Sequence, residues 1–289
     1  MDLEHLKEWI GRTETTTDVA TVSPVARLAA TLDAPETQWS RGDALPPLWH
    51  WLYFLPDAAQ AELGIDGHPA RGGFLPPVPL PRRMFAGGRL SYPGTIRLGD
   101  ELNRVSRVET VELKEGRQGP LVFVTVRHDI NAGGELAVVE EQDLVYIDRR
   151  PSSTDGPREA QPAPDTPWRL RVEPTPALLF RYSALTFNAH RIHYDRDYVT
   201  VEEGYPGLVV QGPLLATLMA ELARRNSTRE TATFSFRSHR PLFEGETALV
   251  LGTPTPHSVD VAVYNDRGVA VATSAISMKS PAINTGYQG

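Results

Sequence analysis

The segment FRYSALTFNAHRIHYDRDY, residues 180–198, gathers side chains whose types and spacing could do chemistry. An apolar run ends in Asn188, and His190, His193 and Asp195 follow closely. Such a cluster could hold a metal, transfer protons or form an ordinary polar loop. The H-x-x-H-x-D spacing offers metal ligands, but no third strong ligand completes a recognisable metal motif. The sequence therefore predicts no metal, and it leaves a proton-transfer site and a structural loop as alternatives.

Predicted helices flank this segment. The stretch TPALLFRYSALTFN (175–188) begins with Thr-Pro, a helix N-cap followed by proline at the first helical position. The stretch GPLLATLMAELARRN (212–226) also has an early proline, and its leucines recur at helical spacing. In the first half, SPVARLAATLDAP (23–35) predicts a helix, and PPLWHWLYFLP (46–56) takes the place of the 212–226 helix.

Residues 148–167 divide the chain. This stretch, DRRPSSTDGPREAQPAPDTP, is rich in Pro, Ser, Asp and Arg and nearly free of large apolar side chains. It cannot bury enough surface to fold, so it is predicted to be a linker. The predicted domains are residues 1–147 and 168–289.

The two halves repeat one order of elements. In each, a Ser/Thr-Pro helix precedes alternating strands with a tight turn, at Gly99-Asp100 and at Gly245-Glu246, and long β segments follow. A strongly twisted antiparallel sheet wrapped around an apolar helix buries such elements well. The prediction is an α+β fold in which two antiparallel sheets each wrap a central helix.

Composition excludes several classes of protein. The net charge of −7 and the pI near 5.6 argue against a nucleic-acid partner, which requires a strong positive field. The absence of cysteine excludes disulfides and thiolate chemistry and suits a reducing compartment. No apolar run approaches the ~18 residues of a membrane span, and residues 1–12 do not resemble a signal peptide. We expect a soluble, cytoplasmic protein without a membrane partner.

Residues 182–193 resemble the signature of MaoC-like (R)-specific enoyl-thioester hydratases and dehydratases. Asn188 stands at the signature's Asp, His190 at its Asn and His193 at its His, with the spacing of five kept. FNAHRIHYD and LPRRMFAGGRL (80–90) are similar to one branch of this family. That branch contains mitochondrial 3-hydroxyacyl-thioester dehydratase and the itaconyl-CoA and mesaconyl-C4-CoA hydratases. The resemblance implies a double hotdog fold with a catalytic second half and a non-catalytic first half that enlarges the acyl-chain cavity.

The resemblance also implies roles for individual residues. Hydration of an enoyl thioester requires a base for water, a proton for Cα and a donor to the thioester oxygen. His193 is the expected acid/base, because histidine titrates near pH ~6.5, alone or shared with Asp195. Asn188 cannot be a base, but its amide can orient the water. The Gly212 N–H, at a helix N-terminus, is the expected oxyanion donor.

The favoured function is a hydro-lyase acting on a branched C5 dicarboxylic acyl-CoA, itaconyl-CoA or mesaconyl-C4-CoA. The alternatives are a 3-hydroxyacyl-ACP or -CoA dehydratase of longer chains, a hotdog acyl-CoA thioesterase and a non-enzymatic acyl-CoA-binding module. No cofactor is expected beyond the CoA of the substrate, and a homodimer is considered. Guanidinium groups suit the CoA phosphates, and the candidates are Arg82, Arg83, Arg237 and Arg240.

Overall fold

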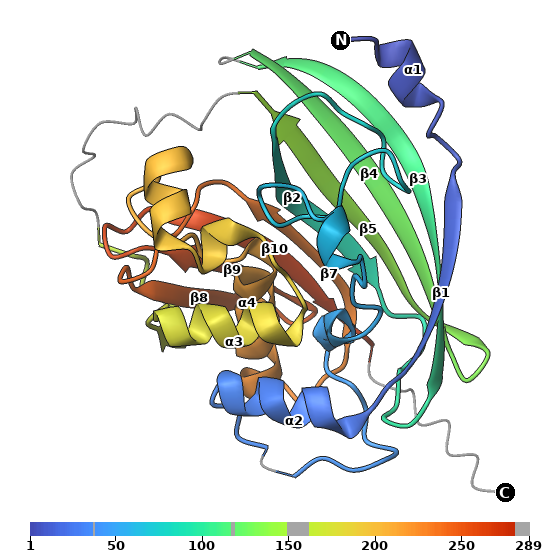
Figure 1. Ribbon diagram of the computed structural model, residues 1–289. Helices are drawn as coiled ribbons and strands as arrows, with labels where there is room; N and C mark the ends of the chain where they lie inside the picture. The colour runs from blue at the N-terminus through green and yellow to red at the C-terminus, as the bar shows by residue number, and fades with distance from the viewer. Residues whose placement is uncertain (37, 117–118, 149–161, 281–289) are drawn as a thin grey trace, which may run out of the picture.

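The computed structural model describes residues 1–36, 38–116, 119–148 and 162–280. Within these ranges, ten strands form one antiparallel sheet in the order β1-β3-β4-β5-β2-β7-β10-β9-β8-β6 (Figure 1). The strands are β1 Thr13–Val19, β2 Arg82–Ser91, β3 Glu101–Gly116, β4 Gly119–Ala132, β5 Glu135–Ile147, β6 Trp168–Val172, β7 Thr231–Ser238, β8 Ala248–Pro254, β9 Ser258–Tyr264 and β10 Ala270–Met278.

The α-helices of the described chain lie mainly on one face of this sheet. They are α1 Leu3–Lys7, α2 Val22–Thr31, α3 Pro176–Leu185 and α4 Gly212–Asn226. Short helical turns occur at η1 Trp49–Leu52, η2 Gln60–Glu62, η3 Arg191–His193 and η4 Tyr198–Glu202. No helix in the described ranges is long and apolar enough to cross a bilayer. The α+β class predicted from the sequence is confirmed.

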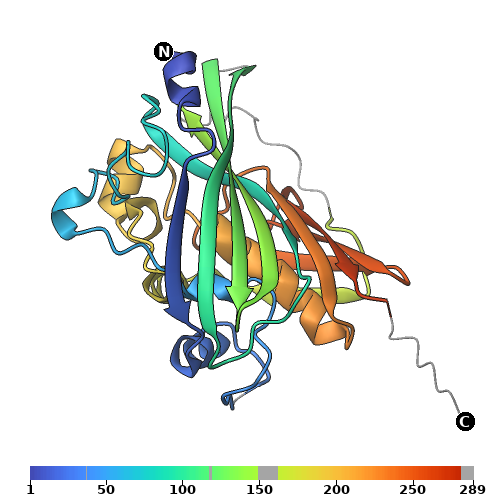
Figure 2. The ribbon, with the colours of Figure 1, turned by 90° about the vertical axis from the view of Figure 1, so that its right-hand side faces the viewer.

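The sheet order contains the internal repeat. The first half reads β1-β3-β4-β5-β2, and the second half, from its outer edge inward, reads β6-β8-β9-β10-β7. Each strand of the first half therefore has a counterpart five strands later, at the equivalent place in the sheet. Figure 2 shows the two halves continuing into one another as a curved sheet. The predicted repeat is thus present in the topology.

The two half-sheets join through β2 and β7, whose pairing runs from Gly87–Arg237 to Ser91–Thr233. Two glycines permit this contact. A Cβ at Gly87 would lie 2.5 Å from the Phe236 carbonyl oxygen, and one at Gly88 would lie 3.0 Å from Cε1 of the Phe236 ring. The prediction of two separate sheets is therefore wrong, because backbone hydrogen bonds cross the boundary between the halves.

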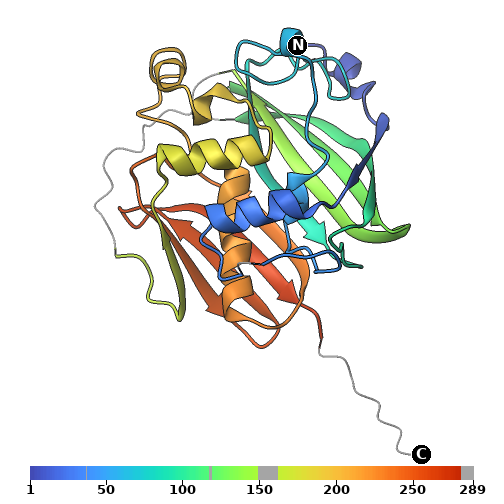
Figure 3. The ribbon, with the colours of Figure 1, turned by 60° about the horizontal axis from the view of Figure 1, so that its bottom comes forward.

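The halves also differ in their central helix. Helix α4 lies across the sheet of the second half (Figure 3), and every residue from 214 to 223 is buried. In the first half, the stretch 46–56 forms only the single turn η1. Prolines bracket this stretch, and Leu48 adopts a left-handed φ of 69°, so a longer helix cannot extend through it. The described residues thus contain one long central helix where two were predicted.

The predicted boundary between the halves falls where the structure is partly described. Strand β5 ends at Ile147 and β6 begins at Trp168, while residues 149–161 of the predicted linker lie outside the described residues. Helices α2 and α3 pack against one another across the boundary, in front of α4 in Figure 3. The residues that follow α3 and the first residues of α4 both face the region between the two halves.

Candidate active site

A cavity of about 1720 Å³ lies between the two halves. Residues from both halves line it, so it requires the complete described fold. Six of the expected site residues are among its walls: Asn188, His193, Gly212 and Arg240 from the second half, and Arg82 and Arg83 from the first. His190 also lines the cavity. The structure thus brings the histidine segment to the start of α4, as the resemblance implies.

His193 is held in one orientation by the segment that leads into α4. It closes the turn η3, and its Nδ1 lies 2.7 Å from the carbonyl oxygen of Val209. A carbonyl oxygen can only accept, so Nδ1 carries the hydrogen and Nε2 keeps its lone pair. The side chain is buried, and this burial lowers its pKa to about 4. His193 is therefore a neutral imidazole at neutral pH with Nε2 as its basic atom.

Asn188 lies three residues after the end of α3. Phe187 adopts a left-handed φ of 48°, and the Asn188 N–H donates to the Ser183 carbonyl oxygen at 2.8 Å. The Asn188 side-chain oxygen accepts from the backbone N–H of His190 at 3.1 Å. This bond closes a local turn, which is a frequent use of asparagine after a helix. The oxygen thus supports the loop, and the amide NH₂ is the group left for a ligand.

Gly212 is the first residue of α4 and lies at the cavity wall. Gln211 at the N-cap makes no side-chain capping bond, and Pro213 has no N–H. Gly212 therefore offers a backbone N–H at the cavity wall, at the positive end of the helix dipole. A Cβ at Gly212 would meet Ser238 at an ordinary 3.5 Å, so packing alone does not demand glycine there.

Asp195 does not reach the cavity. Its carboxylate accepts from Arg191 Nη2 at 2.7 Å and from the Tyr198 backbone N–H at 3.0 Å. These bonds, first that from Tyr198 and then that from Arg191, lower the pKa of Asp195. Asp195 is not one of the residues that line the cavity. Its expected share of the base role is wrong on this placement, because it organises the loop instead.

The four candidate arginines have different surroundings. Arg82 forms an ion pair with Glu203 at 2.6 Å and donates to the Asp148 carbonyl oxygen at 3.0 Å. Arg83 lines the cavity and hydrogen-bonds Tyr146. Arg240 also lines the cavity, whereas Arg237 is exposed on β7 and is not part of the wall. Arg237 is therefore not placed to bind a ligand inside the cavity, although it lies near the end of β7, three residues before Arg240.

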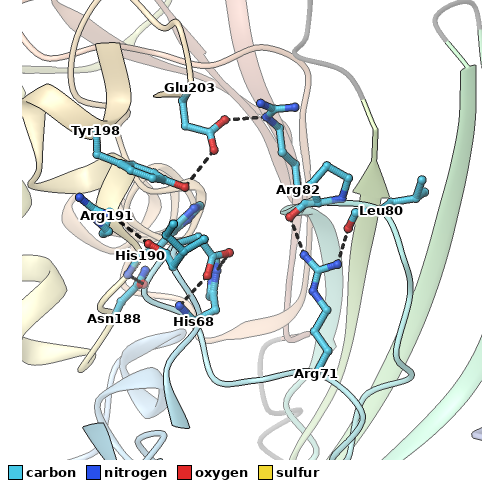
Figure 4. A network of polar contacts seen from close by, with 12 residues as sticks. His68, Arg71, Leu80, Arg82, Asn188, His190, Arg191, Tyr198 and Glu203 are labelled. Carbon is cyan, nitrogen blue, oxygen red and sulfur yellow. Dashed lines mark hydrogen bonds and ion pairs between the residues drawn. The ribbon is translucent and has the colours of Figure 1, made fainter. Parts of the chain in front are cut away.

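The sequence-based prediction missed two residues of the site, Asp66 and His68. Both belong to the loop IDGHPARGG (65–73) of the first half, and the His68 ring lies 4.1 Å from the His190 ring. Figure 4 shows His68 and His190 together on one side of an open space, with Arg71 and Arg82 on the other. The close Asp-x-His spacing in a glycine-rich loop was the available signal.

Asp66, His68 and His190 bring possible metal ligands within 4.8 Å of one another. The charges around them disfavour a cation, however. Arg83 acts electrostatically on both His68 and His190, and Asp66 already accepts two hydrogen bonds from His68. The three residues fit a hydrogen-bonded Asp–His pair stacked on a second histidine better than a metal site.

Residues 48–244 match the family described as hydroxyacyl-thioester dehydratase type 2. Over 271 residues, the chain is 46% identical to mesaconyl-C(4)-CoA hydratase of Chloroflexus aurantiacus, covering 93% of this chain and 96% of that protein. The chain belongs to the hydroxyacyl-thioester dehydratase type 2 family. The family predicted from the residues around His193 is confirmed, and with it an enzyme of the hydratase and dehydratase class.

Solved structures agree on the fold. A MaoC-like dehydratase superposes with a TM-score of 0.68 at 13% identity, covering 96% of this chain and 100% of that one. A Mycobacterium tuberculosis protein described as a double hotdog fold superposes with a TM-score of 0.57 at 13% identity, covering 93% of this chain and 96% of that one. At such low identity these likenesses concern the fold alone, which is a double hotdog.

Proposed function

We propose that this member of the family hydrates a short, branched dicarboxylic enoyl-CoA, with mesaconyl-C4-CoA as the favoured substrate. The same catalyst runs the reverse dehydration. One observation carries the proposal: a neutral histidine, the N-terminus of α4 and Arg83 line one cavity. The named activity of the 46% identical relative supports it.

The residues around His193 suit the hydration of an enoyl thioester. His193 Nε2 can accept a proton from a water that attacks Cβ. The amide of Asn188 lies at the same wall and can orient that water. The thioester oxygen gains negative charge as the enolate forms, and the Gly212 N–H at the start of α4 is a donor to it. These steps need only side chains and backbone, so we propose no cofactor beyond the CoA of the substrate.

A dicarboxylic substrate adds one requirement. In mesaconyl-C4-CoA the carbon that water attacks also carries the free carboxylate, so a cation must lie close to the catalytic histidine. Arg83 meets this requirement, because its charge acts on His68 and His190, and the His190 ring contacts His193 at 5.3 Å. Among the described residues Arg83 has no carboxylate partner, whereas Arg82 is paired with Glu203. We therefore assign Arg83 to the substrate carboxylate rather than to a CoA phosphate.

The cavity has a partly charged wall, which argues against long acyl chains. Its walls in the first half include the charged side chains of Glu14, Asp18 and Arg104, together with His128 and Gln142. Burial already lowers the pKa of Arg104 and raises that of Glu14. A long hydrocarbon tail would remove water from these groups without replacing its hydrogen bonds, which is costly. A short polar acyl group avoids that cost, so the longer-chain dehydratase is the weaker candidate.

The remaining assignments stay proposals of the same kind. Arg82 and Arg240 line the cavity and are the proposed contacts for the CoA phosphates, with Arg237 nearby at the end of β7, three residues before Arg240. The division into a first domain of residues 1–147, a linker of 148–167 and a second domain of 168–289 follows the repeat. A cytoplasmic location and a homodimer are likewise retained as predictions.

A panel of enoyl-CoA esters tests the function. The purified chain is incubated with mesaconyl-C4-CoA, crotonyl-CoA and 2-decenoyl-CoA, and loss of the enoyl ultraviolet absorbance and release of free thiol are recorded together. We expect hydration without thiol release, with the largest kcat/KM for mesaconyl-C4-CoA. Thiol release would indicate a thioesterase, and a preference for 2-decenoyl-CoA would indicate the long-chain dehydratase. Binding with both signals unchanged would indicate a non-catalytic module.

A further inference from the structure

The loop that carries Asp66 and His68 is docked directly on the catalytic segment. The Arg191 backbone N–H donates to the Asp66 carbonyl oxygen at 2.9 Å, and Arg191 Nη1 donates to the Ile65 carbonyl oxygen at 3.0 Å. The approach at Gly67 is so close that a Cβ there would lie 1.9 Å from the Ala189 carbonyl oxygen. A segment of the first half is thereby fixed against the second half at the site itself.

Asp66 fixes the tautomer of His68. His68 Nδ1 lies 2.9 Å from Asp66 Oδ2, and the His68 backbone N–H donates to Asp66 Oδ1 at 3.0 Å. The carboxylate can only accept, so Nδ1 carries the hydrogen and Nε2 is the atom free for proton transfer. A carboxylate in this position both orients an imidazole and stabilises its protonated form. His193 lacks such support, because its Nδ1 partner is the neutral Val209 carbonyl.

His68 is part of a row of three imidazoles at the cavity wall. The centroid of the His190 ring lies 4.1 Å from that of the His68 ring and 5.3 Å from that of the His193 ring. Burial lowers the pKa of His190, and its two neighbours lower it further. His190 is therefore a neutral spacer between the two outer histidines. The row places two imidazoles, each with a fixed Nδ1–H, near one reacting centre.

The residue at position 188 is an asparagine, so the site needs a second proton-transfer group from elsewhere. The MaoC-like signature has an aspartate at this position, whereas this chain has Asn188, which cannot transfer a proton. Asp195 does not line the cavity. We propose that His68, oriented by Asp66, is the second catalytic acid/base and delivers the proton to Cα, while His193 is the base for water. This inference rests on the proposed hydratase function and adds a residue of the first half to its machinery.

The proposed step balances without another reactant. In hydration, the water oxygen forms a bond to Cβ while one water proton passes to His193 Nε2. The electron pair of the Cα=Cβ bond moves to Cα, which takes the proton from His68 Nε2. His68 is protonated and His193 neutral before the reaction, and the reverse holds after it. Proton exchange between the imidazoles or with solvent then restores the starting protonation states. Dehydration is the same sequence reversed.

The charges facing His68 allow it to hold this proton when substrate is bound. Burial lowers its pKa, as do Arg83 and, less strongly, Arg71, while the Asp66 carboxylate opposes them. His190 stacks on it as a neutral ring. A substrate carboxylate on Arg83 offsets the largest of the opposing charges, so that Asp66 becomes the dominant neighbour. The protonated form of His68 is then favoured in the complex rather than in the free enzyme.

His68→Gln and Asp66→Asn test the assignment, with His239→Gln as the matched control. His239 also lines the cavity, but it directly follows the last residue of β7, lies outside the row and hydrogen-bonds Thr273. We expect His68→Gln to lower kcat about 10²–10³-fold, in the range of general acid–base catalysis, with KM changed less than about threefold. Asp66→Asn should lower kcat about tenfold or more, and His239→Gln should stay within about threefold of wild type.

The pH profile separates proton transfer from a structural role. Wild-type kcat should fall at high pH as His68 loses its proton, and His68→Gln should lack that limb. A His68→Gln enzyme with wild-type kcat, or one that keeps the high-pH limb, overturns the assignment while leaving the hydratase function intact. A wild-type chain inactive on every enoyl-CoA of the panel overturns the function and this assignment with it.

Discussion

His193 should make the folded protein sensitive to mild acid. The histidine titrates at 6.5 without burial and at about 4 in the folded chain. Between these pH values the histidine is protonated in the unfolded chain and neutral in the folded chain. The free energy of unfolding therefore rises with pH through this window and falls as the pH is lowered. From pH 7 to pH 5, this one side chain should reduce the free energy of unfolding by roughly 2 kcal/mol.

His193→Gln measures that contribution. Glutamine does not titrate, and its amide can still donate to the Val209 carbonyl oxygen that now accepts from His193. Urea unfolding of wild type and variant is followed at pH 7 and pH 5. The acid-induced loss of unfolding free energy should be smaller in the variant by roughly 2 kcal/mol, which isolates His193 from the other groups that titrate.

An equal acid-induced loss in the two proteins would refute the reasoning. It would mean that His193 titrates alike in the folded and unfolded chains, and hence that it is not a buried neutral imidazole. His193 would then be partly protonated near neutral pH, and the protonated fraction could not act as the base. His128→Gln offers an independent comparison, because burial likewise lowers the pKa of His128, which lies on β4, to about 4.

Three further predictions concern other parts of the molecule. Arg83→Met should lower kcat/KM for mesaconyl-C4-CoA about a hundredfold and leave that for crotonyl-CoA within about threefold, since truncating one partner of a buried charge pair costs several kcal/mol; equal losses would contradict its role toward the carboxylate. Gly67→Ala should lower kcat at least about tenfold with the fold intact by circular dichroism, because its Cβ would meet Ala189 and displace the loop; unchanged turnover would show that the loop position is unimportant. Glu140→Ala should reduce the free energy of unfolding by about 3–5 kcal/mol in urea titrations, because this buried carboxylate accepts from His50 at 2.9 Å; a loss below about 1 kcal/mol would show that the pair is dispensable.

Much of the site was predictable because its signals are local. The spacing from Asn188 to His193 is set by one loop, and Thr175 and Pro213 mark helix starts through contacts within a few residues. The Thr175 side chain accepts from the Leu178 N–H, as an N-cap does. The alternation of apolar residues likewise indicated the strands and their repetition. Each of these features depends on neighbours along the chain, which a sequence displays directly.

The tertiary structure decided what depends on distant contacts. At Gly87 the backbone of Phe236 lies so close that a side chain would not fit, and glycine therefore allows the two half-sheets to join there. The sequence around Gly87 or around Phe236 does not show that the two residues meet. Arg82 and Arg83 are adjacent and identical in type, yet Glu203 neutralises only the first.

The loop with His68 reaches His190 across a long stretch of chain. The sequence by itself determined the family and the His193 segment, because short-range spacing carries both. Only the folded chain decided which charges line the cavity and that the first half contributes to its walls, because burial and pairing between distant residues set both.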